Sequence, residues 1–245
     1  AKGNIILPGM VDGHVHFREP GLTHKEDFFT GSCAAAAGGI TTIIDMPNTK
    51  PPTTTMGLLN QKRELAKKSI VNYGFHFGCT KDNLEEIKKI EDIASVKVYM
   101  NETTGDLMIN DDAALENIFK ASKRIAVHAE NEKVQKALEL FNKVKDKKKR
   151  IYFCHISTKE ELGMIKKQKT KNIFIETCPH YLFLTHEDAE KLPGKGAVKP
   201  GLKTKEDQNA LWEAVRKGLV DTIATDHAPH LLEEKNSSNP PSGFP

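Results

Sequence analysis

The chain has 245 residues, 38% hydrophobic and 28% charged, a length that suits one (β/α)8 barrel with a sizeable core. A formal net charge of +3, from 36 basic and 33 acidic residues, gives no case for nucleic-acid binding, and no apolar run reaches the roughly 18 residues that span a membrane. Four scattered cysteines without a C-x-x-C pair indicate reduced thiols, so we expect a cytoplasmic location.

Eight short apolar or β-branched runs predict β-strands along the chain. They are Met10–His16, Thr41–Met46, Asn72–Gly78, Val96–Met100, Ile125–Ala129, Ile151–His155, Ile173–Thr177 and Thr222–Thr225. Helices are predicted between them at Lys25–Ala37, Met56–Lys68, Asn83–Ile93, Asp112–Ser122, Glu132–Lys149 and Lys205–Gly218, with one more opening at a capping box over Ser157–Glu160. Strand and helix alternate, which is typical of a parallel α/β fold, and eight repeats predict a closed (β/α)8 TIM-like barrel. An open, doubly wound sheet is the alternative, because periodicity does not show closure.

No long helix is predicted after the eighth strand. The chain there turns to Asn, Ser, Pro and Gly and reaches Pro245. A barrel without its last helix exposes apolar strand surface. We therefore expect residues 1–245 to form one barrel domain of a truncated or incompletely recorded chain.

Two histidines, His14 and His16, stand at the end of the first predicted strand. Side chains two residues apart on a strand point the same way, so the two imidazoles are expected side by side. Neutral imidazoles paired in this manner suit zinc or a similar metal. The alternative is two hydrogen-bonded histidines without a metal.

Other chemistry-bearing residues follow the later strands in the same way. Barrel enzymes carry their active-site residues at the C-terminal ends of the strands. Applied to every predicted strand, this rule selects His14, His16, Arg18, Asp45, Asn48, Lys97, His128, Glu130, Cys154, His155, Asp226, His227 and His230. Four histidines, one aspartate and one lysine of this set converge on one rim. A chance alignment at four strand ends is improbable, so we expect a metal site at this rim.

Lys97 lies within a strand that the neighbouring apolar residues mark as buried. Burial favours the free amine of a lysine, which can react with carbon dioxide to form a carbamate. A carbamate carries two oxygens and can bridge two metal ions. The alternative is an amine that reaches the barrel mouth or pairs with a carboxylate.

Seven stretches together carry a resemblance to a known family. They are PGMVDGHVHFREPGLTHKEDF, GGITTIIDMPNTKPP, VKVYMNET, VHAEN, CHISTKEEL, CPHYLFLT and ATDHAPH. In content, order and spacing they resemble the amidohydrolase superfamily and, within it, the dihydroorotases. The resemblance is strongest to the type with a carboxylated lysine, as in the dihydroorotase part of the animal multifunctional pyrimidine-synthesis protein. Its members surround the barrel with a small β-sandwich built from both chain ends, and this flank has no counterpart here.

The resemblance implies a binuclear metal centre, with Zn²⁺ as the expected ion. His14 and His16 would bind the first metal together with Asp226. His128 and His155 would bind the second. A hydroxide and the carbamate on Lys97 would bridge the two.

The resemblance also implies a reaction, the reversible interconversion of dihydroorotate and N-carbamoyl-L-aspartate in de novo pyrimidine biosynthesis. The hydroxide would attack the ring amide, and Asp226 would pass its proton to the leaving nitrogen. Arg18, Asn48 and His230 would hold the substrate carboxylate, because arginine offers a planar fork to such a group. Thr103, in a segment that matches the family's mobile loop, would reach the substrate on closure.

Some assignments stay open. Lys199 stands where many bacterial members have an asparagine that contacts the substrate, so its role is undecided. Allantoinases and hydantoinases share the metals and the ring chemistry, and a non-catalytic scaffold on the same fold is a third possibility. The family resemblance also suggests a homodimer or a complex with other pyrimidine-pathway enzymes. Cys154 precedes His155, and strand alternation predicts that its thiol points away from the histidines.

Overall fold

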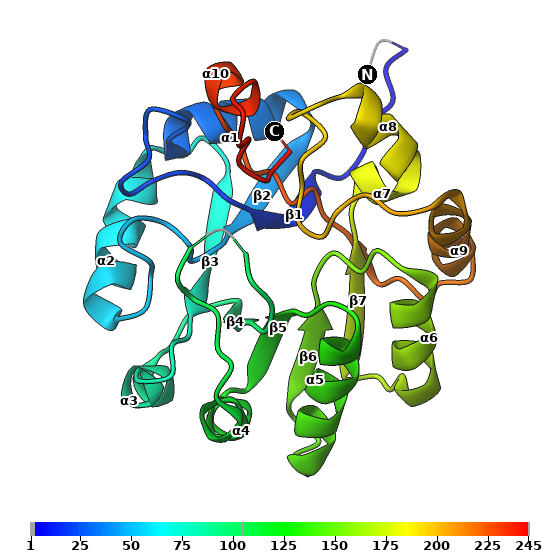
Figure 1. Cartoon of the computed structure of the whole chain (residues 1–245). Helices are drawn as coiled ribbons and strands as arrows, with labels where there is room; N and C mark the ends of the chain where they lie inside the picture. Colours follow the sequence, from blue (N-terminus) through cyan, green and yellow to red (C-terminus); the bar gives the residue numbers. More distant parts are fainter. Residues whose placement is uncertain (1–2, 104, 245) are drawn as a thin grey trace.

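The computed structural model describes residues 3–103 and 105–244, in which eight parallel strands form one sheet in chain order, with helices outside (Figure 1). The strands are β1 Met10–Val15, β2 Ile40–Asp45, β3 Asn72–Gly78, β4 Ser95–Tyr99, β5 Arg124–His128, β6 Arg150–Phe153, β7 Ile173–Thr177 and β8 Thr222–Ile223. Every predicted strand is present, with ends shifted by at most two residues.

The ring closes between β8 and β1. An isolated parallel bridge joins Val15 to His227, and the backbone N–H of His16 donates to the carbonyl of His227 at 2.7 Å. The closed barrel is therefore confirmed, and the open-sheet alternative is wrong. Closure brings the ends of β1 and β8, more than two hundred residues apart in the chain, to one place.

The predicted helices are present, and several are shorter than predicted. The helices are α1 Phe28–Ala37, α2 Met56–Leu65, η1 Ala66–Lys68, α3 Leu84–Lys89, α4 Asp112–Ala121, α5 Glu132–Lys143, α6 Lys159–Gln168, α7 Pro179–Phe183, α8 His186–Lys191, α9 Lys205–Arg216 and α10 Leu232–Lys235. The cap of α6 is Thr158, whose side chain accepts from the N–H of Glu161, so the capping box lies one residue later than predicted. Glu161, and not Glu160, completes the capping box, because its carboxylate accepts from the N–H groups of both Ser157 and Thr158.

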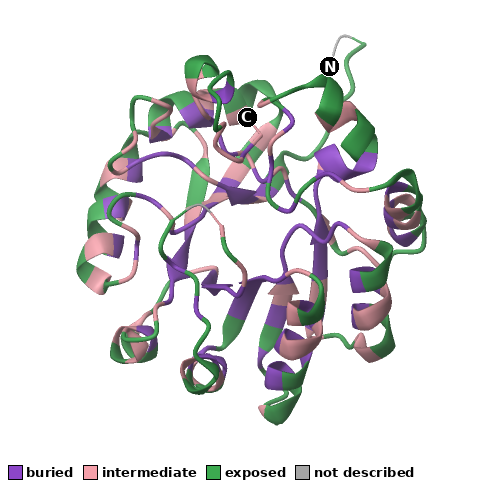
Figure 2. Cartoon of the chain, viewed as in Figure 1, coloured by how far each residue is buried: buried purple, intermediate pink, exposed green. Residues whose placement is uncertain are grey.

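The core lies mainly between the strands and the helices (Figure 2). All five residues of β4 are buried, and α5 turns one apolar face toward the sheet. Met46, Ala126 and Cys154 form a further small buried cluster, against which Tyr152 packs.

The described residues after β8 contain one short helix, α10, and no long one. All eight named strands of the described residues belong to the barrel, so no β-sandwich is present in them. Ile5, Ile6 and Leu7, before β1, are 86%, 83% and 76% exposed. In the described part of the chain, no helix combines the length and the apolar character needed to cross a membrane.

Candidate active site

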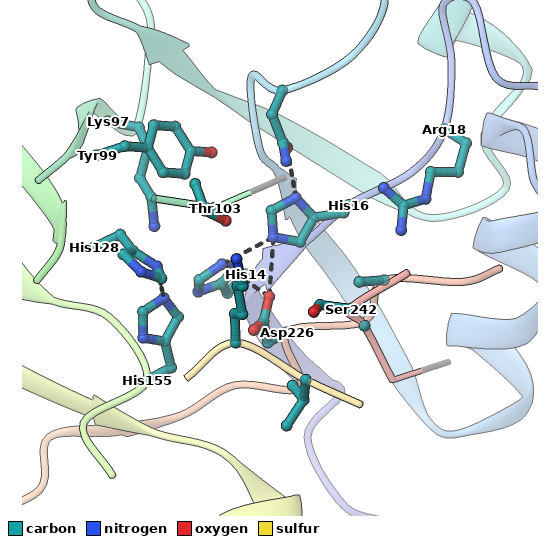
Figure 3. A pocket seen from close by; sticks show the side chains of 15 residues that line it. His14, His16, Arg18, Lys97, Tyr99, Thr103, His128, His155, Asp226 and Ser242 are labelled. Carbon is teal, nitrogen blue, oxygen red and sulfur yellow. Dashed lines mark hydrogen bonds and ion pairs between the residues drawn. The ribbon is translucent and has the colours of Figure 1, made fainter. Parts of the chain in front are cut away.

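One pocket opens at the C-terminal ends of the strands (Figure 3). It is lined by His14, His16, Arg18, Asn48, Lys97, Tyr99, Thr103, His128, His155, Val198, Lys199, Asp226, Ala228, Ser242 and Gly243. Of the residues predicted to bind metal or substrate, only His230 is missing from this lining. The barrel thus brings to one cavity residues that lie in, or follow, seven of the eight strands.

His14, His16 and Asp226 form the first cluster. Nε2 of His14 lies 3.2 Å from Nε2 of His16, and Oδ1 of Asp226 lies 3.2 Å and 2.9 Å from these two nitrogens. Their possible ligand atoms all lie within 4.8 Å of one another. Three donor atoms that converge on one point in this way can hold a divalent metal ion.

His128 and His155 form the second cluster. Nδ1 of His128 lies 2.9 Å from Nε2 of His155, and both rings are buried. Nδ1 of His155 is buried without a hydrogen-bond partner. Two imidazole nitrogens that face each other in this way can offer their lone pairs to one metal ion, so this pair also suits a metal.

Lys97 lies beside the two clusters and is 1% exposed. Its Nζ lies 3.0 Å from Sγ of Cys154, so Cys154 points into the barrel beneath the histidines and the prediction for its thiol is wrong. Strand alternation fails here because β6 ends at Phe153 and His155 has a φ of 39°. His155 and Asp226, with a φ of 53°, both occupy the left-handed region, a strain that is common at functional sites.

Glu176 on β7 is a functional residue that the sequence prediction missed. Its Oε1 lies 2.8 Å from Nδ1 of His14 and accepts from the backbone N–H of His155, while its Oε2 accepts from the hydroxyl of Tyr152 at 2.6 Å. A glutamate inside the apolar run Ile173–Thr177 was the available signal. His14, Cys154 and Glu176 also form a group whose ligand atoms lie close enough to hold a metal.

The charges of the site divide its histidines into two kinds. Burial lowers the pKa of His16 to about 4 and, with the charge of His128, that of His155 well below its usual value, so both imidazoles are neutral and can offer lone pairs. Burial also acts on His14, but the carboxylates of Glu176 and Asp226 outweigh it and raise the pKa of His14 to about 10. The two carboxylates therefore gather negative charge around His14, at the point where a metal cation would sit.

Of the three residues predicted to bind a carboxylate, Arg18 and Asn48 line the pocket, and His230 contacts Arg18. Arg18 is 4% exposed, its Nε donates to the carbonyl of Pro229 at 2.9 Å, and its Nη2 lies 3.1 Å from Nε2 of His230. His230 thus contacts Arg18 without lining the pocket itself. Oδ1 of Asn48 accepts from Nδ1 of His16 at 2.6 Å. Thr103 and Lys199 complete the wall at the mouth.

A family model for the amidohydrolase family matches residues 5–242. The chain belongs to the amidohydrolase family. This amidohydrolase chain is 40% identical over 291 residues to a dihydroorotase of Methanosarcina acetivorans, covering 100% of the chain and 62% of that relative. It is 42% identical over 252 residues to the multifunctional protein CAD of Squalus acanthias, covering 98% of the chain and 11% of CAD.

Among solved structures, the amidohydrolase chain is similar to an L-hydantoinase (dihydropyrimidinase) from Arthrobacter aurescens, with a TM-score of 0.87 and 29% identity. The match covers 97% of this chain and 62% of the hydantoinase. The amidohydrolase chain therefore spans less than two thirds of the length of each of these relatives.

Proposed function

We propose that this chain is the catalytic barrel of a dihydroorotase, which opens the ring of dihydroorotate to N-carbamoyl-L-aspartate and closes it again. The observation that carries the proposal is one pocket that combines two histidine clusters with a buried arginine for a carboxylate. The similarity to dihydroorotases over the whole chain supports it.

The donor set fits a pair of divalent metal ions, which we propose are Zn²⁺. His14, His16 and Asp226 would hold one ion, and His128 and His155 the other. The nitrogens that face each other within each cluster support this assignment. When bound, the ions supply Lewis-acid activation of the ring carbonyl and of water.

We propose that Lys97 carries a carbamate that bridges these ions. Its Nζ lies 3.0 Å from Sγ of Cys154, in a fully buried position. A carbamate on this nitrogen would place an anion beside the two cation sites, which is electrostatically favourable.

The protein side chains orient the substrate and move its proton. Arg18, fixed by the Pro229 carbonyl and by His230, presents its guanidinium to the substrate carboxylate. Asn48 and Thr103 line the same pocket and would complete the hold on the substrate. Burial raises the pKa of Asp226, but the neighbouring His14 outweighs this and holds that pKa well below its usual value, so the carboxylate is ionised. Asp226 would take the proton of the attacking water. Asp226 would then return this proton to the ring nitrogen that leaves.

A second candidate is a cyclic-amide hydrolase of another specificity, favoured by the structural similarity to the L-hydantoinase. The buried Arg18 favours a substrate with a carboxylate, which hydantoin lacks. We also propose that the protein works as a homodimer or within a complex of pyrimidine enzymes. The match of 98% of the chain within a multifunctional relative supports the complex.

The test is the ring opening of dihydroorotate by the purified protein, followed by ultraviolet absorbance with zinc and bicarbonate supplied. Hydantoin and allantoin are measured in parallel. Turnover of dihydroorotate alone is expected. Preferential turnover of hydantoin or allantoin would establish the second candidate. Metal-loaded protein that turns over none of the three would refute both candidates.

A further inference from the structure

Lys235, the last residue of α10, is a buried lysine whose ammonium binds only backbone groups among its hydrogen bonds. It is 6% exposed. Its Nζ donates to the carbonyls of Ala197, Pro241 and Gly243 at 2.9, 2.8 and 3.0 Å. A lysine ammonium has three N–H donors, so these acceptors satisfy all of them.

The three carbonyls belong to two segments that form one wall of the candidate active site. Residues 197–199 contribute Val198 and Lys199 to the pocket, and residues 241–244 contribute Ser242 and Gly243. The segments also meet directly, because the N–H of Gly243 donates to the carbonyl of Ala197 at 3.0 Å. Lys235, which does not line the pocket, therefore binds both segments of this wall, residues 197–199 and residues 241–244.

The wall continues to the arginine proposed to bind the substrate. The carbonyl of Ser242 lies 3.0 Å from Nε2 of His230, and the same nitrogen lies 3.1 Å from Nη2 of Arg18. The N–H of Ala228 donates to the carbonyl of Phe244, which holds the second segment against the loop that follows Asp226. Displacement of residues 241–244 would thus move groups that surround the substrate carboxylate.

We propose that Lys235 is a positioning residue that holds residues 197–199 and 241–244 in place around the substrate. The expected effect of Lys235 on KM and kcat rests on the proposed function. Lys235 does not line the pocket, so it acts through the backbone that it binds. Because the metal cluster of His14, His16 and Asp226 has its own contacts, the loss of Lys235 should weaken substrate binding and spare the chemical step.

The chain contains a matched control. Lys149 is 5% exposed, and its Nζ also donates to three backbone carbonyls, those of Phe119, Lys120 and Ser122. It precedes β6 and therefore lies at the opposite end of the barrel from the pocket. Lys149→Met removes the same kind of interaction as Lys235→Met without touching the pocket wall.

The experiment compares wild type, Lys235→Met, Lys235→Arg and Lys149→Met by steady-state kinetics, metal content and amide hydrogen exchange. Lys235→Met should raise KM for dihydroorotate about tenfold, with kcat changed less than about threefold and metal content unchanged. Exchange at Gly243 and Ala228 should accelerate. Lys235→Arg, which keeps the charge, should recover part of KM and of the protection. Lys149→Met should lower Tm and leave KM unchanged.

Equal effects of the two Met variants on KM would overturn the proposal, as would unchanged exchange at Gly243 in Lys235→Met. If Lys235→Met does not fold, Lys235→Arg decides: it must alter exchange in residues 241–244 and KM more than Lys149→Met does. If no form of the protein, wild type included, turns over dihydroorotate, the proposed function fails. Hydrogen exchange alone then decides whether Lys235 holds the wall.

Discussion

Oε1 of Glu176 lies 2.8 Å from Nδ1 of His14, although 162 positions separate the two residues. Both side chains are buried, and the hydroxyl of Tyr152 holds the other carboxylate oxygen at 2.6 Å. Glu176 thereby keeps the proton on Nδ1 and directs Nε2 of His14 toward Asp226 and His16. A carboxylate behind a ligating histidine fixes its tautomer and raises its basicity.

We predict that Glu176→Gln weakens metal binding at the first site. The neutral amide is a poorer acceptor for His14 and adds no negative charge, so the affinity should fall about 10- to 100-fold. Competition with a chelator measures the change. Glu160→Gln, at an exposed position, is the control. An unchanged metal affinity in Glu176→Gln would show that Glu176 only supports packing.

We predict that metal loading depends on carbon dioxide through Lys97. Apoprotein reconstituted with zinc in buffer free of carbon dioxide should bind less metal than apoprotein reconstituted with bicarbonate, because the bridging carbamate cannot form. Lys97→Arg, which cannot form this carbamate, should load poorly in both buffers. Metal analysis after desalting gives the result. Equal loading of the wild type in both buffers would contradict the carbamate.

We predict that Arg18→Lys impairs substrate binding selectively. A lysine cannot contact the Pro229 carbonyl and also present a two-pronged fork to a carboxylate. KM for dihydroorotate should rise at least about tenfold, with a smaller effect on kcat. Arg216→Lys, on the exposed face of α9, should have no effect. Similar kinetics for Arg18→Lys and wild type would remove Arg18 from the binding site.

We predict a pH-dependent stability term from His76, which is buried beneath the pocket. Burial lowers its pKa to about 3, and its ring nitrogens lie 2.8 Å from Oγ of Ser95 and 3.0 Å from the carbonyl of Gly13. Because the folded pKa lies below the unfolded value of 6.5, the unfolded chain binds the proton first as the pH falls. The stability that neutral His76 provides is complete above pH 6.5 and is lost toward pH 3.

Urea unfolding at pH 7 and pH 5 measures this term. Wild type should lose about 2 kcal/mol more between these two pH values than His76→Gln, which has no titrating ring. His186→Gln, at an exposed position, should follow the wild type. Parallel losses in wild type and His76→Gln would mean that His76 is not held neutral in the fold.

The sequence predicted the features that depend on local spacing. Alternating strands and helices indicated the barrel, and the positions of His14 and His16 two residues apart placed their rings side by side. Of the residues that the strand-end rule selected, eight line one pocket, whereas the other five, His230 among them, do not. The eight are His14, His16, Arg18, Asn48, Lys97, His128, His155 and Asp226. These predictions succeeded because side-chain direction on a strand and helix capping are decided within a few residues.

The tertiary structure decided what depends on residues far apart in the chain. Closure between β1 and β8, the contact of Glu176 with His14, and the three carbonyls gathered by Lys235 join segments whose pairing no local pattern encodes. Cys154 shows that local periodicity can fail even between neighbouring residues. The left-handed backbone at His155 ends the strand alternation, and the thiol of Cys154 faces Lys97. Periodicity gives the direction of a side chain on a regular element, whereas packing of the whole barrel decides what that side chain meets.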